Sequence, residues 1–224
     1  MSIKDAINAR HSVRQYQDRE IPSEIVGLLN KEISECNSQG DLNIQLLMND
    51  PQPFNSFLFH YGKFVGVNNY LALVGKKTAD IEEKIGYYGE RIVLKAQSLG
   101  LNTCWVALTY NKRKAKALIN KGEKLVCVIS IGYGNTQGNP RKSKTIVEVA
   151  NIDEFSPAWF ISGVEAALLA PTALNQQKFK FNYKGNKVSL KSTGGFYSKI
   201  DLGIVKYHFE VGAGVENFQW VDSK

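Results

Sequence analysis

The stretch KLVCVISIGYG, residues 124–134, is the clearest buried strand of the sequence. Its nearly continuous apolar run, closed by glycine, is typical of a strand inside a sheet. The linker GNTQGNP at 134–140 follows directly, and its Gly, Asn and Pro content predicts a break in regular structure. Beyond this linker the pattern of helices and strands begins again, so the strand closes a first structural unit.

Helix caps, hydrophobic spacing and turn residues predict the other elements on both sides of this strand. In the first unit we expect a capped helix from Ser2 to Arg10, a second helix from Pro22 to Cys36, a turn at 37–40, strands at 42–48 and 68–77, a long helix from about Asp80 to Leu99 ended by Gly100, and a short loop at 101–108. In the second unit we expect a helix opened by Ser156 and Pro157, a hairpin at 175–192 with Gly185 and Asn186 at its turn, and a second long helix at 202–214.

The two units repeat a similar spacing of glycines. Gly89 and Gly100 in the first unit are separated by the same interval as Gly203 and Gly214 in the second. Chance is the alternative explanation, because helices often end at glycine. We interpret the repeat as an internal duplication, with an N-terminal half at 1–138 and a diverged C-terminal half at 139–224 that packs on it.

Composition limits the class of protein. The chain has 224 residues, 43% of them hydrophobic, and can bury a sizeable core. No run approaches the roughly eighteen apolar residues of a membrane span, and Asp5 lies where a signal peptide needs an apolar stretch. Three cysteines without disulfide or ligand spacing are expected to be small buried hydrophobes, with no metal site. We therefore expect a cytoplasmic protein without membrane contact.

The net charge of +7 invites a nucleic-acid interpretation. The basic residues, however, are spread over 76–78, 112–116 and 140–144, without the aromatic pattern of an RNA-binding sheet or a helix-turn-helix signature. A small anionic cofactor or substrate explains the excess equally well, so no nucleic-acid partner is expected.

The heptapeptide RHSVRQY, residues 10–16, offers a place for such an anion. In an extended segment alternate residues project from one face, which would align Arg10, Ser12 and Arg14. The alternative is a solvated charged face, which is what most clusters of like charge are.

Four motifs together resemble the FMN-dependent nitroreductase family: RHSVRQY after the first helix, GLNTCW at 100–105, ISIGYG at 129–134 and APTALNQQKF at 170–179. The family's Arg-Arg-Ser-x-Arg pattern matches the first, and its Ala-Pro-Ser-Ala-x-Asn-x-Gln pattern matches the last. The resemblance spans most of the chain. It implies an α+β (α/β sandwich) nitroreductase-like fold, with two diverged half-repeats of mixed sheet flanked by helices.

The order of the motifs departs from the family. There, the Ala-Pro-Ser motif follows the arginine motif by one helix, whereas here it appears some 160 residues later. In family homodimers FMN lies between subunits, with the arginine motif from one and the Ser/Asn motif from the other. The chain is similar to a subset of nitroreductases in which a monomer mimics that dimer and completes one flavin site; a plain homodimer is the alternative.

The resemblance also implies which residues bind FMN. Basic side chains would hold its phosphate, hydroxyls its ribityl chain, and an amide the flavin edge; the loop 103–108 would offer a backbone N–H to the ring. The candidate cofactor-binding residues are Arg10, His11, Ser12, Arg14, Ala107, Leu108, Arg141, Lys142, Lys144, Pro171, Thr172, Ala173, Asn175 and Gln177. No side chain is assigned as a catalytic acid or base.

By resemblance, the expected function is transfer of hydride from NADH or NADPH, through FMN, to a small electron acceptor such as a nitroaromatic or a quinone. One alternative is another flavin reaction on the same fold, such as dehalogenation or oxidation of a small heterocycle. Another is a flavin-binding sensor without efficient turnover. No dinucleotide fingerprint in the sequence selects between NADH and NADPH.

Overall fold

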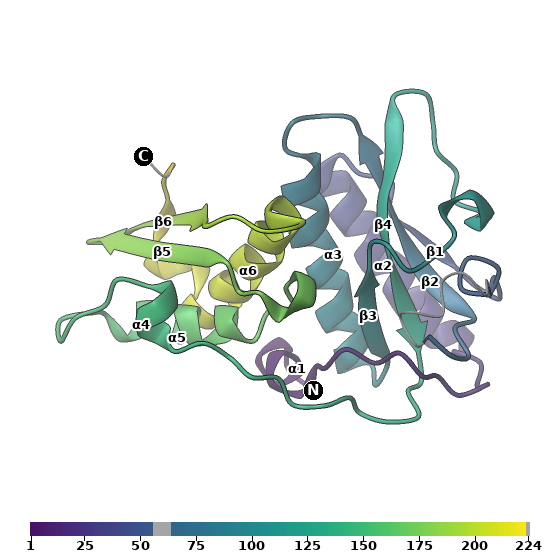
Figure 1. The fold of residues 1–224 in the computed structure, drawn as a ribbon, viewed down its shortest axis with the longest axis horizontal. Helices are drawn as coiled ribbons and strands as arrows, with labels where there is room; N and C mark the ends of the chain where they lie inside the picture. Colours follow the sequence, from purple (N-terminus) through teal and green to yellow (C-terminus); the bar gives the residue numbers. More distant parts are fainter. Residues whose placement is uncertain (56–63, 223–224) are drawn as a thin grey trace.

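The computed structural model describes residues 1–55 and 64–222 and has a mixed α+β architecture with two sheets (Figure 1). The predicted fold class is confirmed. In chain order the elements are α1 (Ile3–Ala9), α2 (Ser23–Gly40), β1 (Gln45–Leu47), β2 (Asn69–Lys76), α3 (Ile81–Ser98), β3 (Asn102–Val106), η2 (Lys112–Lys114), β4 (Glu123–Gly132), α4 (Ile146–Val149), α5 (Ala158–Leu168), η3 (Ala173–Asn175), β5 (Phe179–Lys184), β6 (Lys187–Ser192), α6 (Ser198–Ala213), η4 (Val215–Asn217) and β7 (Gln219–Trp220).

The four-stranded sheet has the order β1-β2-β4-β3, and every neighbouring pair is antiparallel. The predicted buried strand is β4, which lies inside this sheet and pairs with β2 on one side and β3 on the other. Its last six residues are all buried. Two neighbours and two covered faces explain why this stretch reads as a continuous apolar run.

Two local predictions are wrong. Residues 37–40 are not a turn but the last turn of α2, which ends where Asp41 adopts the left-handed conformation with φ 52°. Residues 101–108 are not a loop throughout, because 102–106 form β3 and pair with β4. That pairing depends on a strand more than twenty residues away in sequence, so local turn signals did not reveal it.

The second sheet has the order β5-β6-β7, with an antiparallel hairpin and a parallel third strand. The hairpin turns at Gly185, whose φ of 60° suits glycine. The order helix, two antiparallel strands, helix, strand occurs in both units, as α2-β1-β2-α3-β3 and α5-β5-β6-α6-β7. In both, the final strand runs parallel to the second. Ancestral duplication and the division at 138/139 stay predictions.

Helices α3 and α6 pack against each other along their lengths, and α3 lies between α6 and the four-stranded sheet (Figure 1). Glycines make the approach close. A Cβ at Gly203 of α6 would lie 2.6 Å from the Tyr87 backbone nitrogen and closer still to the Glu83 carbonyl oxygen. A Cβ at Gly86 of α3 would collide with the Ile200 carbonyl. The two backbones therefore touch, and this contact joins the two units.

The structure also shows the state of the three cysteines and bears on the expectations about membrane-spanning helices and metal-binding clusters. Cys36, Cys104 and Cys127 are free and buried, as expected. Across residues 1–55 and 64–222, no helix is long and apolar enough to cross a membrane, and no cluster of acidic, Cys and His side chains could hold a metal ion.

The close helix contact predicts that Gly203→Ala destabilises the protein by about 1–3 kcal/mol, because overpacking forces the backbones apart. Gly27→Ala is the matched control: Gly27 also lies within a helix, but a Cβ there meets nothing within 4 Å. That variant should be neutral or stabilised by up to about 1 kcal/mol. Urea unfolding of the three proteins measures both effects; equal stability of the two variants would contradict the backbone contact.

Candidate functional site

The arginine motif forms an extended segment beside β3. The backbone N–H of Val13 donates to the Thr103 carbonyl at 3.0 Å, and the N–H of Val65 donates to the Arg14 carbonyl at 2.9 Å. Bonds on both sides hold the segment extended, as the alternation of its residues predicts. Arg10, only 2% exposed, lies at its deep end, and exposed Arg14 lies at its open end.

Cys104 on β3 lies near the polar residues of this segment. Burial raises the pKa of the Cys104 thiol, and Arg14, Ser12 and Arg10 each oppose that rise. All three therefore act on one buried sulfur. That their side chains face the same way stays a prediction.

The linker after β4 runs alongside the N-terminal segment that follows α1 (Figure 1). Gly138, with φ 81°, lies so close that a Cβ there would be 2.6 Å from the His11 Cβ. Arg141 Nη2 then donates to the Arg10 carbonyl oxygen at 3.3 Å. The basic linker is thus attached to the first motif.

The same linker is attached to the Ala-Pro motif at its next residues. Asn175 Nδ2 donates to the Lys142 carbonyl at 2.7 Å. Lys144 binds buried Gln177 twice: its backbone N–H donates to Gln177 Oε1 at 2.7 Å, and its Nζ donates to the Gln177 carbonyl at 2.8 Å. Because the linker's Arg141 contacts the first motif and Lys142 the second, the two motifs lie close together although they are far apart in sequence.

Backbone strain is concentrated in the Ala-Pro motif. Leu174, Asn175 and Gln177 have φ angles of 52°, 53° and 46°, a region that non-glycine residues seldom occupy. Such conformations persist where surrounding contacts enforce them, and they gather at functional sites. Asp201 provides the contacts here: it accepts from the Ala173 N–H at 2.9 Å and from Gln176 Nε2 at 2.7 Å.

Asp201 lies in the first turn of α6 and is 8% exposed. Burial raises its pKa to about 6, although the hydrogen bonds from Gln176 and Ala173 oppose that rise. The carboxylate therefore fastens the strained motif to α6.

Positive charge is in surplus where the motifs meet. Burial, followed by the neighbouring Arg10, lowers the pKa of Arg141 to about 10, and burial also lowers the pKa of Arg10. Among the residues that the structure describes, no carboxylate lies within ion-pair distance of Arg14, Arg141 or Lys142. A group of cations with so little counter-charge suits an anionic ligand.

Glu90 and His208 were not singled out in the sequence, yet both are wholly buried beneath this region. Glu90 Oε1 lies 3.8 Å from Arg10 Nε and 2.9 Å from His208 Nε2. Glu90 Oε2 accepts from the Trp105 indole at 2.8 Å. The available signal was that Glu90 lies between Gly89 and Arg91, next to the apolar run 92–94 on α3, but its partners lie on other elements.

The remaining candidate residues make fewer contacts with the two motifs. Thr172 Oγ1 accepts from the Gln177 N–H at 3.1 Å, and His11 Nδ1 lies 3.1 Å from the Ala9 carbonyl. Ala107 and Leu108 follow β3, and in the described residues no hydrogen bond joins them to either motif. Pro171 is half-buried at the start of its motif. The binding role of every candidate stays a prediction.

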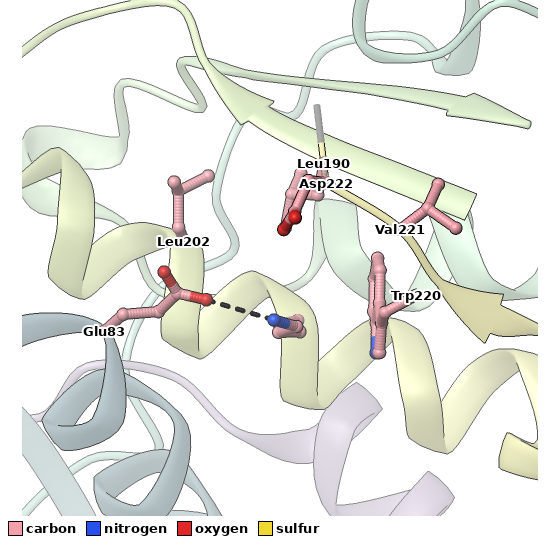
Figure 2. A pocket seen from close by; sticks show the side chains of 7 residues that line it. Glu83, Leu190, Leu202, Trp220, Val221 and Asp222 are labelled. Carbon is pink, nitrogen blue, oxygen red and sulfur yellow. Dashed lines mark hydrogen bonds and ion pairs between the residues drawn. The ribbon is translucent and has the colours of Figure 1, made fainter. Parts of the chain in front are cut away.

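Figure 2 shows a separate surface pocket of about 190 Å³ between α3, α6 and the second sheet. Two of its charged side chains, Glu83 and Lys206, are already paired at 3.1 Å, and Asp222 is the third charged residue that lines it. The pocket includes none of the motif residues and is smaller than most cofactor sites. It lies outside the candidate site.

Known proteins resemble the chain in sequence family and in fold. The family model described as "Putative TM nitroreductase" matches residues 2–213. A crystal structure from Thermotoga maritima MSB8, described as a "putative nitroreductase", covers 100% of this chain and 90% of its own, with 24% identity and a TM-score of 0.69. No curated protein sequence gives a significant match.

Two further structures carry cofactors in their descriptions. One, from Desulfovibrio desulfuricans, is described as a "putative nitroreductase in complex with FMN"; it has 16% identity and a TM-score of 0.55, and covers 70% of this chain and 99% of its own. The other is a variant of the FMN- and NADPH-dependent nitroreductase NfnB from Sphingopyxis sp. strain HMH, with 14% identity and a TM-score of 0.53, covering 69% of this chain and 100% of its own. At these identities the likeness establishes the fold.

The setting of Asp201 predicts a pH dependence of stability. Its pKa is raised from 3.8 to about 6, so the native state binds this proton more tightly than the unfolded state. The free energy of unfolding should therefore fall as pH rises from 4 to 6, by up to about 3 kcal/mol from this group. In Asp201→Asn, the free energy of unfolding should decrease less between pH 4 and 6, because the contribution of this carboxyl group is absent.

Urea unfolding of the wild type and Asp201→Asn at several pH values from 4 to 6 measures the difference. Glu154→Gln, which removes an exposed carboxylate, is the control and should retain the wild-type slope. An Asp201→Asn slope identical to the wild-type slope would contradict the raised pKa.

Proposed function

Because the chain belongs to the nitroreductase family, whose model spans residues 2–213, we propose that it is an FMN-dependent oxidoreductase. It transfers hydride from NADH or NADPH to a small electron acceptor such as a nitroaromatic or a quinone. The observation that carries this proposal is the surplus of cations where the two motifs meet, which suits the phosphate of FMN. Two structures of the same fold support it: one described as a complex with FMN, and one of an enzyme described as FMN- and NADPH-dependent.

The residues present fit FMN. Arg10 Nε is buried and has no hydrogen-bond partner, which is costly unless a ligand anion offsets the charge. Arg14, in the same motif, and Arg141, which contacts the Arg10 carbonyl, supply further donors, and guanidinium groups match phosphate geometry. Asn175 keeps an amide oxygen for the flavin edge, because its Nδ2 is already engaged by Lys142.

Gln177 and Lys144 have a supporting role in this proposal. Their polar ends bind each other, and Gln177 Nε2 also donates to the Leu168 carbonyl at 2.9 Å. They hold the linker against the Ala-Pro motif, which orients Arg141 and Asn175. Bound FMN would supply the redox chemistry by accepting and releasing hydride. The chain would bind its phosphate and orient its ring, with no side-chain acid or base assigned.

One chain supplies both motifs in this proposal. Arg141 contacts Arg10, and its neighbour Lys142 contacts Asn175, all within a single polypeptide. A monomer would then complete one site from its two halves, as a homodimer would by pairing subunits. The expected stoichiometry is one FMN per chain.

The purified protein should carry FMN, not FAD, at one per chain, and NADH or NADPH should bleach its absorbance under anaerobic conditions. The physical reason is a single cation cluster for one phosphate. An absorbance scan, mass identification of the released flavin and a stoichiometric titration check this. Protein that binds no added FMN would overturn the proposal, and bound flavin that neither nucleotide reduces would favour a flavin sensor.

Arg141→Ala should weaken FMN binding about tenfold to a hundredfold, because charge-assisted hydrogen bonds contribute roughly 1.5–3 kcal/mol each. Its affinity for riboflavin, which lacks the phosphate, should change little. Arg113→Ala removes an exposed arginine outside the motifs and is the control. Fluorescence titrations with both flavins measure the four affinities; equal FMN affinity of the two variants would show that Arg141 does not bind the phosphate.

A further inference from the structure

The buried polar cluster beneath the candidate site joins the two helices at the centre of the fold. Glu90 on α3 and His208 on α6 are both 0% exposed. Arg10, at the end of α1, contributes a third buried ionisable group, and its guanidinium lies beside the same carboxylate. Trp105 on β3 contacts the other carboxylate oxygen. Four elements thus meet at Glu90.

The hydrogen bonds of His208 restrict its protons. Its Nδ1 lies 3.0 Å from the Ala166 carbonyl, which can only accept, so Nδ1 carries a hydrogen. Its Nε2 lies 2.9 Å from Glu90 Oε1, and a hydrogen bond there needs one further proton, on either atom. Glu90 Oε2 cannot carry that proton toward Trp105, because the indole N–H can only donate. The pair shares one proton between Nε2 and Oε1.

The charge of the pair is zero in both arrangements. An imidazolium beside a carboxylate and an imidazole beside a carboxylic acid have the same net charge. Glu90 is therefore balanced by His208 and leaves Arg10 largely uncompensated. This agrees with the geometry of Arg10, whose Nε is 3.8 Å from Glu90 Oε1 and makes no hydrogen bond.

We propose that Glu90 and His208 are a proton-sharing pair of positioning residues, which packs beneath Arg10 without neutralising it and so preserves the positive charge of the anion site. The pair joins the two units, since Glu90 belongs to the first and His208 to the second. The other ionisable groups that interact electrostatically with Glu90 are Arg10, Arg141 and Tyr207. The identity of the anion as the FMN phosphate rests on the proposed function.

Single replacements of the two partners should have opposite consequences. In His208→Gln the carboxylate of Glu90 loses its counter-charge partner and becomes free to neutralise Arg10. In Glu90→Gln no carboxylate is present, and the amide can still donate to His208 Nε2 and accept from Trp105. The double variant again has a pair of zero charge.

The experiment compares the affinity for FMN with the affinity for riboflavin in the wild type, both single variants and the double variant. We expect His208→Gln to lose about tenfold to thirtyfold of the preference for FMN, the effect of one added negative charge nearby. Glu90→Gln should bind FMN in preference to riboflavin as strongly as the wild type does, or more strongly. The double variant should regain the preference for FMN that His208→Gln alone loses. Circular dichroism establishes that each variant is folded.

A purely structural role predicts a different pattern, in which both single variants weaken both flavins and the double variant is worse than either. That result would overturn the proposal. A second measurement needs neither flavin nor variant folding: in the imidazole ¹⁵N spectrum of the wild type, His208 should carry a hydrogen on Nδ1, which donates to the Ala166 carbonyl. A spectrum in which Nδ1 carries no hydrogen would also overturn the proposal. If FMN does not bind at all, the ¹⁵N spectrum still tests the proton-sharing pair. Failure of the proposed function can therefore be distinguished from failure of this inference.

Discussion

The backbone contact between α3 and α6 is the constraint on which the rest of the structure depends. Gly86 and Gly203 let the two helices approach until a Cβ on either would collide with the other backbone. Because α3 also covers the four-stranded sheet, the contact brings the second unit against the first. It also brings Glu90 and His208 within hydrogen-bond distance and places the start of α6, with Asp201, beside the Ala-Pro motif. A small cost in helix propensity at the glycines is thus offset by extensive burial between helices.

The candidate site concentrates features that are unfavourable in a protein interior. Burial lowers the pKa of Arg10, although Glu90 opposes this, and burial followed by the charge of Arg10 lowers the pKa of Arg141. Three non-glycine residues of the Ala-Pro motif adopt left-handed backbone conformations. Stability alone would select against both, since buried positive charge and strained dihedral angles cost free energy. Their coincidence where two distant motifs meet is what a binding site for an anionic ligand requires.

Patterns that depend on neighbouring residues led to correct predictions. The capping box of Ser2 and Asp5, the glycine after α3, the hairpin turn at Gly185 and the buried strand β4 are all confirmed. The errors concern residues whose state depends on distant partners. Residues 37–40 look like a turn, but the helix continues because Cys36 and Gly40 are buried against the rest of the molecule. Residues 102–106 become a strand because β4 offers them an edge.

The sequence by itself determined the motifs and their wide separation, because these are properties of residue type and spacing, and the family resemblance carried by those motifs implied the α+β class. Only the tertiary structure decided how the motifs meet: the linker joins Arg10 to Asn175 through Arg141 and Lys142. It alone also showed that Glu90 is shared by His208, Trp105 and Arg10, and that Asp201 secures the Ala-Pro motif. The physical reason is that the protonation, charge and hydrogen bonding of a buried group depend on what packs around it, and those neighbours come from other elements, in the case of Glu90 and His208 118 residues apart.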